Sequence, residues 1–142
     1  MQVQELMNSN VVSITPEESA SLAARLLTRH NVGSLPVCSN GQQMRGIITD
    51  RDIVLRCVAG ENDPQATPVR EIMSKDVVTI TPGEDVRKAA SLMAHHQIRR
   101  LPVVDNGRLV GMLSLGDMAK NNLFNIEASK ALSEISENWK KK

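Results

Sequence analysis

The sequence predicts a mixed α/β (α+β) fold, in which two pseudo-symmetric repeats pack as one module and a C-terminal helix follows. The first observation behind this prediction is an internal repeat, because the pattern that opens at Val3 recurs 66 residues later at Val69. The second is the order of elements in each copy, which reads strand, helix, strand, strand, helix. The third is size, since a copy of about 60 residues is marginal as a free-standing core.

The repeat divides the chain into four parts. Repeat 1 covers residues 3–58, and repeat 2 covers residues 69–123. The segment 59–68 is polar and contains prolines, which is typical of a linker. The segment 126–142 lies outside the repeat, and we expect it to cover the pair or a dimer surface; the alternative is that it docks an effector. It predicts a helix because its apolar residues share one helical face: Ala128, Ala131, Leu132, Ile135 and Trp139.

The first strand and helix of each copy follow from short local patterns. The β-branched runs at 11–14 and 77–80 predict strands. Thr15 and Thr81 each precede a proline and stand three residues before a glutamate, which is typical of a helix N-cap. Alanines and other apolar residues then continue at helical spacing. We expect these helices to end at two corresponding pairs: His30-Asn31 and His96-Gln97.

The remainder of each copy predicts a hairpin and a second helix. The apolar runs Leu35–Val37 and Leu101–Val104 predict buried strands. Asn40-Gly41 and Asn106-Gly107 are typical of tight hairpin turns. The returning strands are expected at Gly46–Thr49 and Leu109–Ser114, and the last helices at Asp52–Cys57 and Asp117–Asn122.

The composition excludes several classes of function. The net charge of +1 gives no electrostatic reason to expect binding of nucleic acid or of an anionic membrane. Aromatic residues make up only 1% of the chain, as Phe124 and Trp139, so a surface that stacks bases is excluded and the core must be aliphatic. No apolar run approaches the roughly 20 residues of a membrane span, and the N-terminus lacks the pattern of a signal peptide.

The two cysteines form neither a metal-type pair nor a disulfide framework. Cys38 follows an apolar run and is expected to be a small core residue. His95 and His96 are adjacent and therefore point in different directions on a helix, and His30 has no partner at a spacing typical of metal ligands. We therefore expect no metal site, and the cysteine usage favours a cytoplasmic location.

Three motifs occur in the same order in both copies, namely Val-x-Glu-[Ile/Leu]-Met, Leu-Pro-Val and Gly-x-x-[Thr/Ser]-x-x-Asp. Together they resemble the CBS-domain pair, from Val3 to about Leu123. The resemblance implies a regulatory module rather than an enzyme. It implies adenosine-containing ligands such as AMP, ADP, ATP, NAD(H) or S-adenosylmethionine, held in two clefts between the copies, with no required cofactor. It also implies a flat homodimer.

The resemblance also implies which residues contact the ligand. The aspartate of the last motif takes the ribose hydroxyls in the family, and this role falls on Asp52 and Asp117. A carboxylate can accept hydrogen bonds from both hydroxyls of a cis-diol. Thr49 and Ser114 would contact ribose or phosphate. The alternative is that both aspartates only cap the helices that follow them.

Other expected ligand contacts differ between the copies. Arg99 and Arg100 precede the second Leu-Pro-Val, whereas the first copy has no cation there and carries Arg51 in its last motif. Arginine grips phosphate with paired hydrogen bonds, so the cations are unequally shared; the alternative for Arg99 and Arg100 is a solvated strand edge. Val32 and Ile98 would supply apolar walls for adenine. The expected ligand-binding set is completed by Thr15, Ser34, Pro36, Thr81 and Pro102, of which both threonines equally suit N-cap roles.

The sequence shows no Cys/His or Ser/His constellation and no phosphate-binding glycine loop. No catalytic motif therefore indicates an enzyme. The resemblance therefore implies a module that binds an adenosine-containing small molecule, senses nucleotide and transmits a conformational change. Its expected partners are a second copy of the chain and an unidentified effector protein, with no nucleic acid and no membrane. The alternative is a structural dimerisation module with unoccupied pockets.

Overall fold

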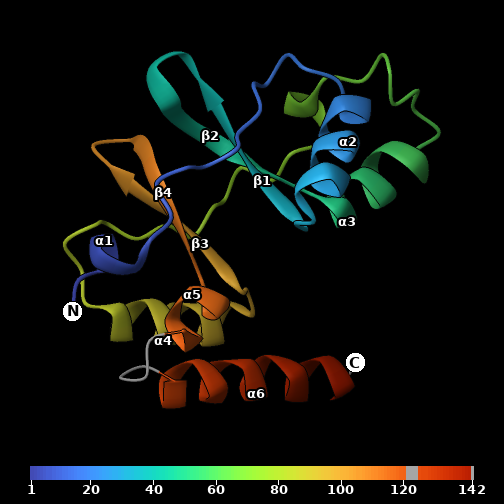
Figure 1. Cartoon of the computed structure of the whole chain (residues 1–142). Helices are drawn as coiled ribbons and strands as arrows, with labels where there is room; N and C mark the ends of the chain where they lie inside the picture. The colour runs from blue at the N-terminus through green and yellow to red at the C-terminus, as the bar shows by residue number, and fades with distance from the viewer. Residues whose placement is uncertain (121–124, 142) are drawn as a thin grey trace. The chain divides into compact units, whose positions relative to one another are not determined.

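The chain forms two compact units in the computed structural model, which describes residues 1–120 and 125–141 (Figure 1). Within the last helix, side chains are described for residues 127–137. Unit 1 comprises Met1–Val11 and Val78–Lys142, and unit 2 comprises Val12–Val77. Each unit has its own aliphatic core of Val, Ile, Leu and Ala side chains, with buried methionines in unit 1 and Cys57 in unit 2.

In unit 2, the strands β1 (Ser34–Ser39) and β2 (Gln43–Thr49) form an antiparallel hairpin, and the helix α2 (Ala20–His30) contacts both β1 and η2 (Ile53–Val58). The hairpin turn at Asn40-Gly41 is confirmed, with Gly41 at a φ of 72°. The elements of unit 2 are α2 (Ala20–His30), β1 (Ser34–Ser39), η1 (Asn40–Gln42), β2 (Gln43–Thr49), α3 (Asp50–Asp52), η2 (Ile53–Val58) and η3 (Val69–Glu71).

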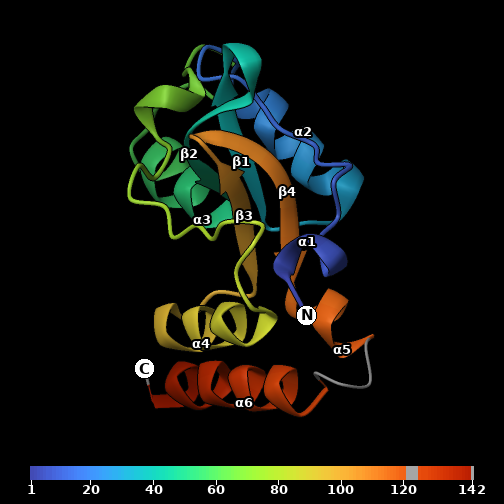
Figure 2. The same cartoon turned by 90° about the vertical axis from the view of Figure 1, so that its left-hand side faces the viewer.

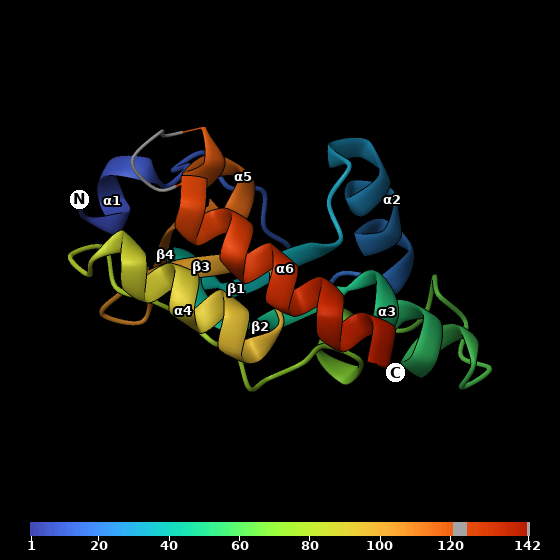
Figure 3. The ribbon, with the colours of Figure 1, turned by 90° about the horizontal axis from the view of Figure 1, so that it is seen from below.

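Unit 1 repeats this hairpin and adds the C-terminal helix. The turn at Asn106-Gly107 is confirmed, with φ values of 52° and 79° at its two residues. Figures 2 and 3 show α6 (Asn125–Lys141) lying along α4 (Val86–His96), and α6 also contacts α5 (Leu115–Ala119). The elements of unit 1 are α1 (Val3–Leu6), α4 (Val86–His96), β3 (Arg100–Asp105), β4 (Arg108–Ser114), α5 (Leu115–Ala119) and α6 (Asn125–Lys141).

Each unit contains most of one repeat and the opening segment of the other. In unit 1, the amide of Val3 donates to the carbonyl of Glu84 at 2.9 Å. In unit 2, the amide of Val69 donates to the carbonyl of Glu18 at 2.8 Å. Both valines are fully buried. These four residues correspond under the 66-residue shift, so the repeat in the sequence produces the same contact in each unit.

Two glycines allow each opening segment to lie against a returning strand. Ser74 bridges to Ile47 of β2, and Asn8 bridges to Met112 of β4. The glycine beside each bridge is Gly46 or Gly111, and both are buried. A Cβ atom built on Gly46 would lie 2.6 Å from the carbonyl oxygen of Ser74, which is closer than any side chain tolerates. The glycine of the last motif is therefore explained by close approach of the backbone.

The prediction that residues 11–14 and 77–80 form strands is wrong. Each makes a single parallel bridge, from Ile14 to Val37 in unit 2 and from Ile80 to Val103 in unit 1. A parallel ladder would next use the amide two residues further on, at Pro16 or Pro82. Proline has no N–H group, so the pairing cannot continue.

The predicted N-cap roles of Thr15 and Thr81 are also wrong. The helices begin later, and their caps are Ser19, which accepts from the Leu22 amide at 3.1 Å, and Asp85, which accepts from the Arg87 amide at 2.8 Å. Each threonine instead opens a turn, since its carbonyl accepts from the amide three residues on. Proline in the second position is equally typical of a turn and of a helix start. The predicted helix ends are confirmed, at residues with left-handed backbone: Asn31 and Gln97.

The returning strands and last helices have different bounds from those predicted. The strands begin earlier, at Gln43 and Arg108, and each carries a bulge near its glycine. The last helices begin at Asp50 and Leu115, because Thr49 and Ser114 cap them and place each motif aspartate in the first turn. In unit 2 this helix continues as the π-helix η2, and in unit 1 the predicted end at Asn122 lies outside the described residues.

The C-terminal helix is confirmed, and its buried face is narrower than predicted. Ala128, Ala131 and Ile135 are buried, which follows the i, i+3, i+7 spacing of one helical face. Leu132 is 41% exposed, so its predicted place on that face is wrong. It lies about 100° around the helix from Ala131 and about 40° from Ala128, which places it at the margin of the buried face. The side chain of Trp139, like residue Phe124, lies outside the described residues.

The glycine contacts predict a graded effect of alanine substitution on stability. Gly46→Ala should lower the free energy of unfolding by about 1–3 kcal/mol, because the new methyl group meets a backbone carbonyl. Gly111→Ala should cost less, since the closest atom is the sulfur of the flexible Met7 side chain. Gly83→Ala is the control, because nothing lies within 4 Å of its Cβ position. Urea denaturation measures all three, and equal losses at positions 46 and 83 would contradict the assignment.

The predicted core role of Cys38 is confirmed, since this cysteine is only 4% exposed. Burial raises the pKa of its thiol above the ordinary value, and a hydrogen bond with Ser13 acts in the opposite direction. The folded state therefore favours the neutral thiol. The resulting stability is fully present below the ordinary thiol pKa of about 8.5 and is lost as the pH rises toward the folded-state pKa. Urea denaturation between pH 7.5 and 10, in reductant, should show a steeper alkaline loss for the wild type than for Cys38→Ala; parallel curves would contradict this.

Candidate functional site

The last motif forms a capping box at the end of each returning strand. The amide of Asp52 donates to Thr49 Oγ1 at 3.0 Å, and the amide of Thr49 donates to Asp52 Oδ2 at 3.0 Å. Ser114 and Asp117 repeat this arrangement, with distances of 3.0 and 2.9 Å. Both aspartates therefore cap their helices. Capping uses one carboxylate oxygen for the backbone amide, and a carboxylate has further acceptor positions.

The strand that carries each Leu-Pro-Val begins beside this capping box. Ser34 pairs with Thr49 in the hairpin of unit 2, and Arg100 pairs with Ser114 in the hairpin of unit 1. The amide of Asp50 donates to the carbonyl of Gly33 at 3.1 Å. The corresponding bond in unit 1 joins the Leu115 amide to the Arg99 carbonyl at 3.0 Å. Residues about 15 positions apart in each repeat thus meet at one end of each hairpin.

The Thr-Pro segments approach the same strands. Pro36 and Pro102 are buried, and their carbonyls accept from the amides of Ile14 and Ile80 at 3.0 and 3.1 Å. Thr15 and Thr81 directly follow those amides and are exposed. The structure therefore places these threonines next to the strands that carry the other expected site residues.

The expected apolar walls and cations differ in exposure. Val32 and Ile98 are half-buried and pack against the cores of their units. Arg51 and Arg99 are exposed, whereas Arg100 is half-buried. The expected site residues thus divide into one set in each unit: Thr15, Val32, Ser34, Pro36, Thr49, Arg51 and Asp52 in unit 2; Thr81, Ile98, Arg99, Arg100, Pro102, Ser114 and Asp117 in unit 1.

Asp52 has additional partners that sequence reasoning missed. The hydroxyl of Ser74 donates to both carboxylate oxygens, at 3.1 and 3.3 Å. The guanidinium of Arg56 lies 3.9 Å from Oδ1 and donates to the carbonyls of Ile72 and Met73. Arg56 could have been found from its i+4 position after Asp52. Ser74 is distant in the sequence and gives no local pattern.

Asp117 has a different environment in the same motif. Its residue is half-buried, whereas Asp52 is only 7% exposed. Burial lowers the pKa of the Arg100 guanidinium from its ordinary value, and the negative charge of Asp117 acts in the opposite direction. Unit 1 therefore places a partly buried cation beside its motif carboxylate. The residue of unit 1 that corresponds to Ser74 is Asn8, and its side chain accepts a hydrogen bond from the Asn10 amide.

The histidines lie at helix ends. His30 ends α2, and His95 and His96 end α4 with their rings 4.8 Å apart in an edge-to-face arrangement. Within residues 1–120 and 125–141, no group of three His, Cys, Asp or Glu side chains could hold a metal ion. Among the helices in this part of the chain, none has both the length and the apolar content of a membrane span.

Comparisons with known proteins cover both repeats. The CBS domain family matches residues 3–58 and 69–123. The chain is 45% identical over 134 residues to the CBS domain-containing protein YhcV of Bacillus subtilis (strain 168), covering 94% of each chain. It is 30% identical over 118 residues to Hypoxic response protein 1 of Mycobacterium tuberculosis (strain ATCC 25618 / H37Rv), covering 83% of this chain and 82% of the relative.

Solved structures show the same similarity. The crystal structure of Hypoxic Response Protein I with two coordinated zinc ions matches with a TM-score of 0.78 and 29% identity, over 85% of this chain and 98% of that one. The CBS domain pair of protein MJ0100, in complex with 5′-methylthioadenosine and S-adenosyl-L-methionine, matches with a TM-score of 0.73 and 28% identity, over 84% of this chain and 98% of that one. The protein therefore belongs to the CBS-domain family and contains two CBS domains in tandem.

Proposed function

We propose that this protein is a regulatory module that binds an adenosine-containing ligand and transmits a conformational change to a partner. Family membership supports a regulatory role. The complex of the MJ0100 domain pair with two adenosine compounds supports the class of ligand. The expected homodimer, the cytoplasmic location and the absence of catalysis are further parts of this proposal.

The observation that carries the proposal is the place of Arg100 at the start of β3, where it pairs in the hairpin with Ser114, the residue that forms the capping box with Asp117. The capping box fixes the carboxylate, which can accept hydrogen bonds from vicinal ribose hydroxyls. A partly buried arginine beside it suits a phosphate, because desolvation strengthens a charge-assisted hydrogen bond. We expect the unit 1 set to prefer ligands that carry both groups.

A second candidate function rests on Asp52. Its carboxylate is engaged by Ser74 and lies near Arg56, so its internal contacts already explain why an aspartate stands there. This favours a structural role for the unit 2 set. If both sets behaved in this way, the protein would be a dimerisation module with unoccupied pockets.

Isothermal titration calorimetry with AMP, ATP, NADH and S-adenosylmethionine tests the proposal. At least one ligand should bind saturably, and at 100 times its dissociation constant it should stabilise the fold by about 2.7 kcal/mol. Arg100→Ala should weaken AMP and ATP at least tenfold and affect S-adenosylmethionine, which lacks phosphate, much less. Lys120→Ala, also in unit 1, controls for loss of one positive charge. No binding and no thermal shift with any of these compounds would contradict the proposal.

Two substitutions separate the capping role of the motif from its ligand role. Asp117→Asn keeps an acceptor for the Ser114 amide but removes the charge, so it should weaken ligand binding with little loss of stability. Ser114→Ala removes the acceptor for the Asp117 amide and should cost about 1 kcal/mol of stability. Denaturation and calorimetry on both variants, with Asp52→Asn alongside, provide the measurement. Wild-type affinity in Asp117→Asn, Asp52→Asn and Arg100→Ala would show that the site assignment is wrong.

A further inference from the structure

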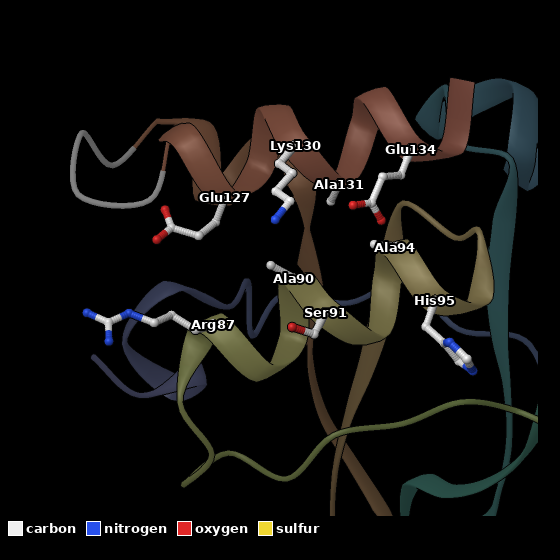
Figure 4. A pocket seen from close by; sticks show the side chains of 9 residues that line it. All are labelled: Arg87, Ala90, Ser91, Ala94, His95, Glu127, Lys130, Ala131 and Glu134. Carbon is white, nitrogen blue, oxygen red and sulfur yellow. The ribbon is translucent and has the colours of Figure 1, made fainter. Parts of the chain in front are cut away.

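The C-terminal helix encloses a cavity within unit 1. α6 lies along α4, and its residues Ala128, Ala131 and Ile135 are buried in the core of that unit (Figure 2). Beside this contact, a cavity of about 360 Å³ lies between α4 and α6 (Figure 4). Its volume falls at the lower end of the range of about 300–1,000 Å³ that is typical of small-molecule sites. Its described lining residues come from α4 and α6 alone, so the site at the end of the hairpin does not account for it.

The α6 wall of the cavity carries three charged side chains of alternating sign. Glu127, Lys130 and Glu134 extend from α6 on the side that faces α4 (Figure 4). Their spacing of three and four residues places them on one helical face. Within the described part of the chain, Lys130 forms no ion pair with either glutamate. The wall therefore presents charges in the order negative, positive, negative, and these charges do not pair with one another.

The α4 wall has short side chains opposite this charged row. It is formed by Ala90, Ser91 and Ala94, with Arg87 and His95 near the two ends of the cavity (Figure 4). The short side chains leave room beneath the charged row. The alanine methyl groups supply an apolar lining between the charged groups. The cavity is therefore complementary to a molecule with charged groups at both ends and an aliphatic middle.

Glu127 supplies a further observation that points to a ligand. One of its carboxylate oxygens is buried and has no hydrogen-bond partner among the described residues. A buried carboxylate oxygen without a donor destabilises the folded state, and such groups are rare in native proteins. A donor that enters the cavity would remove this cost. Because the group is an anion, a positively charged N–H donor suits it best.

We propose that the cavity between α4 and α6 binds a free basic α-amino acid, of the class of lysine, ornithine or arginine. Its α-ammonium group would donate to Glu127, its carboxylate would accept from Lys130, and the cation at the end of its side chain would reach Glu134. The step from Glu127 to Lys130 places their Cβ atoms about 5–6 Å apart, which suits two opposite charges carried by one carbon atom. The step from Glu127 to Glu134 is about 10.5 Å along the helix, which an extended lysine can span with a hydrogen bond at each end.

The same three charges disfavour other occupants. A diamine would offer no anion to Lys130, and an amino acid with an apolar side chain would offer no cation to Glu134. A nucleotide would bring its phosphate close to two carboxylates, and like charges at close range repel. Water alone would satisfy Glu127 but would not make the stability of the protein depend on a particular solute. The inference is independent of the proposed adenosine site, because none of the residues expected there lines the cavity.

Isothermal titration calorimetry of the full chain in low salt, with L-lysine, L-ornithine and L-arginine, tests this proposal. At least one of them should bind saturably and should raise the midpoint of thermal unfolding. Three analogues of lysine each lack one charged group: cadaverine lacks the carboxylate, L-norleucine lacks the side-chain cation, and 6-aminohexanoate lacks the α-ammonium group. Each should bind at least tenfold more weakly than L-lysine. The equivalent analogues serve if ornithine or arginine binds more tightly.

Variants that remove one charge assign each group of the ligand to its partner. Lys130→Gln should abolish the preference for L-lysine over cadaverine, and Glu134→Gln should abolish the preference over L-norleucine. Glu127→Gln should weaken L-lysine at least tenfold. It should not lower the thermal midpoint of the ligand-free protein, because the buried carboxylate oxygen has no partner to lose. Glu137→Gln, at an exposed position of α6 outside the cavity, is the matched control and should leave the affinity unchanged.

Several outcomes would overturn the proposal, with circular dichroism confirming that every variant is folded. One is the absence of saturable binding by all three amino acids. Another is binding of cadaverine as tight as that of L-lysine, which would reveal a site for amines alone. Binding that no variant at positions 127, 130 and 134 weakens would place the amino acid elsewhere on the protein. A lower thermal midpoint for Glu127→Gln than for Glu137→Gln would make Glu127 a structural residue and would contradict its assigned role.

Discussion

The close approach of backbone to backbone at Gly46 and Gly111 is the constraint on which each unit depends. It allows Ser74 to pair with Ile47 and Asn8 to pair with Met112, so that an opening segment lies flat against a returning strand. Once that segment is in place, Val3 or Val69 enters the core, and Ser74 comes within reach of Asp52. The contact between Ser74 and Asp52 in unit 2 therefore depends on Gly46, which stands six residues before the motif aspartate and has no side chain to block the approach.

The two copies share a backbone and differ in what their polar groups do. In unit 2 the motif aspartate is enclosed by Ser74 and Arg56, while Arg25 and Arg29 of α2 and Arg51 of the motif are exposed. In unit 1 the motif aspartate lies beside the half-buried Arg100, and α6 covers the outer helical face. The two units therefore differ in the environment of the motif aspartate and in whether a further helix covers their outer helices.

Much of the fold could be predicted from local sequence, because turns, helix ends and hairpins are fixed by a few neighbouring residues. Asn40-Gly41, Asn106-Gly107 and the left-handed helix ends at Asn31 and Gln97 are of this kind. The Thr-Pro-x-Glu pattern failed because the same residues satisfy a turn and a helix start. The β-branched runs failed as strands because the prolines that follow them remove the next donor. Leu132 failed because an apolar residue at the margin of a helical face can remain exposed.

The site was less predictable, since its partners come from distant parts of the chain. Thr49 and Asp52 are three residues apart and show their capping box in the sequence, whereas Ser74 reaches Asp52 from 22 residues away. The half-buried state of Arg100 and the exposed state of Arg99 cannot be separated from two adjacent letters. Only the register of β3 with β4, which sets Arg100 opposite Ser114, distinguishes them.

The pairing of each opening segment with the other repeat also bears on how such a protein arises by duplication. The segment that repeats in the sequence and the segment that folds as a unit are out of phase by about one short helix, since unit 2 runs from Val12 to Val77 while the repeat runs from Val3. A single ancestral copy would have lacked the opening segment that its core requires, unless it received one from an identical neighbour. Fusion of two copies would have turned that exchange between molecules into a contact within one chain. The last copy in the row would still need the first opening segment, which is why residues 1–11 return to it.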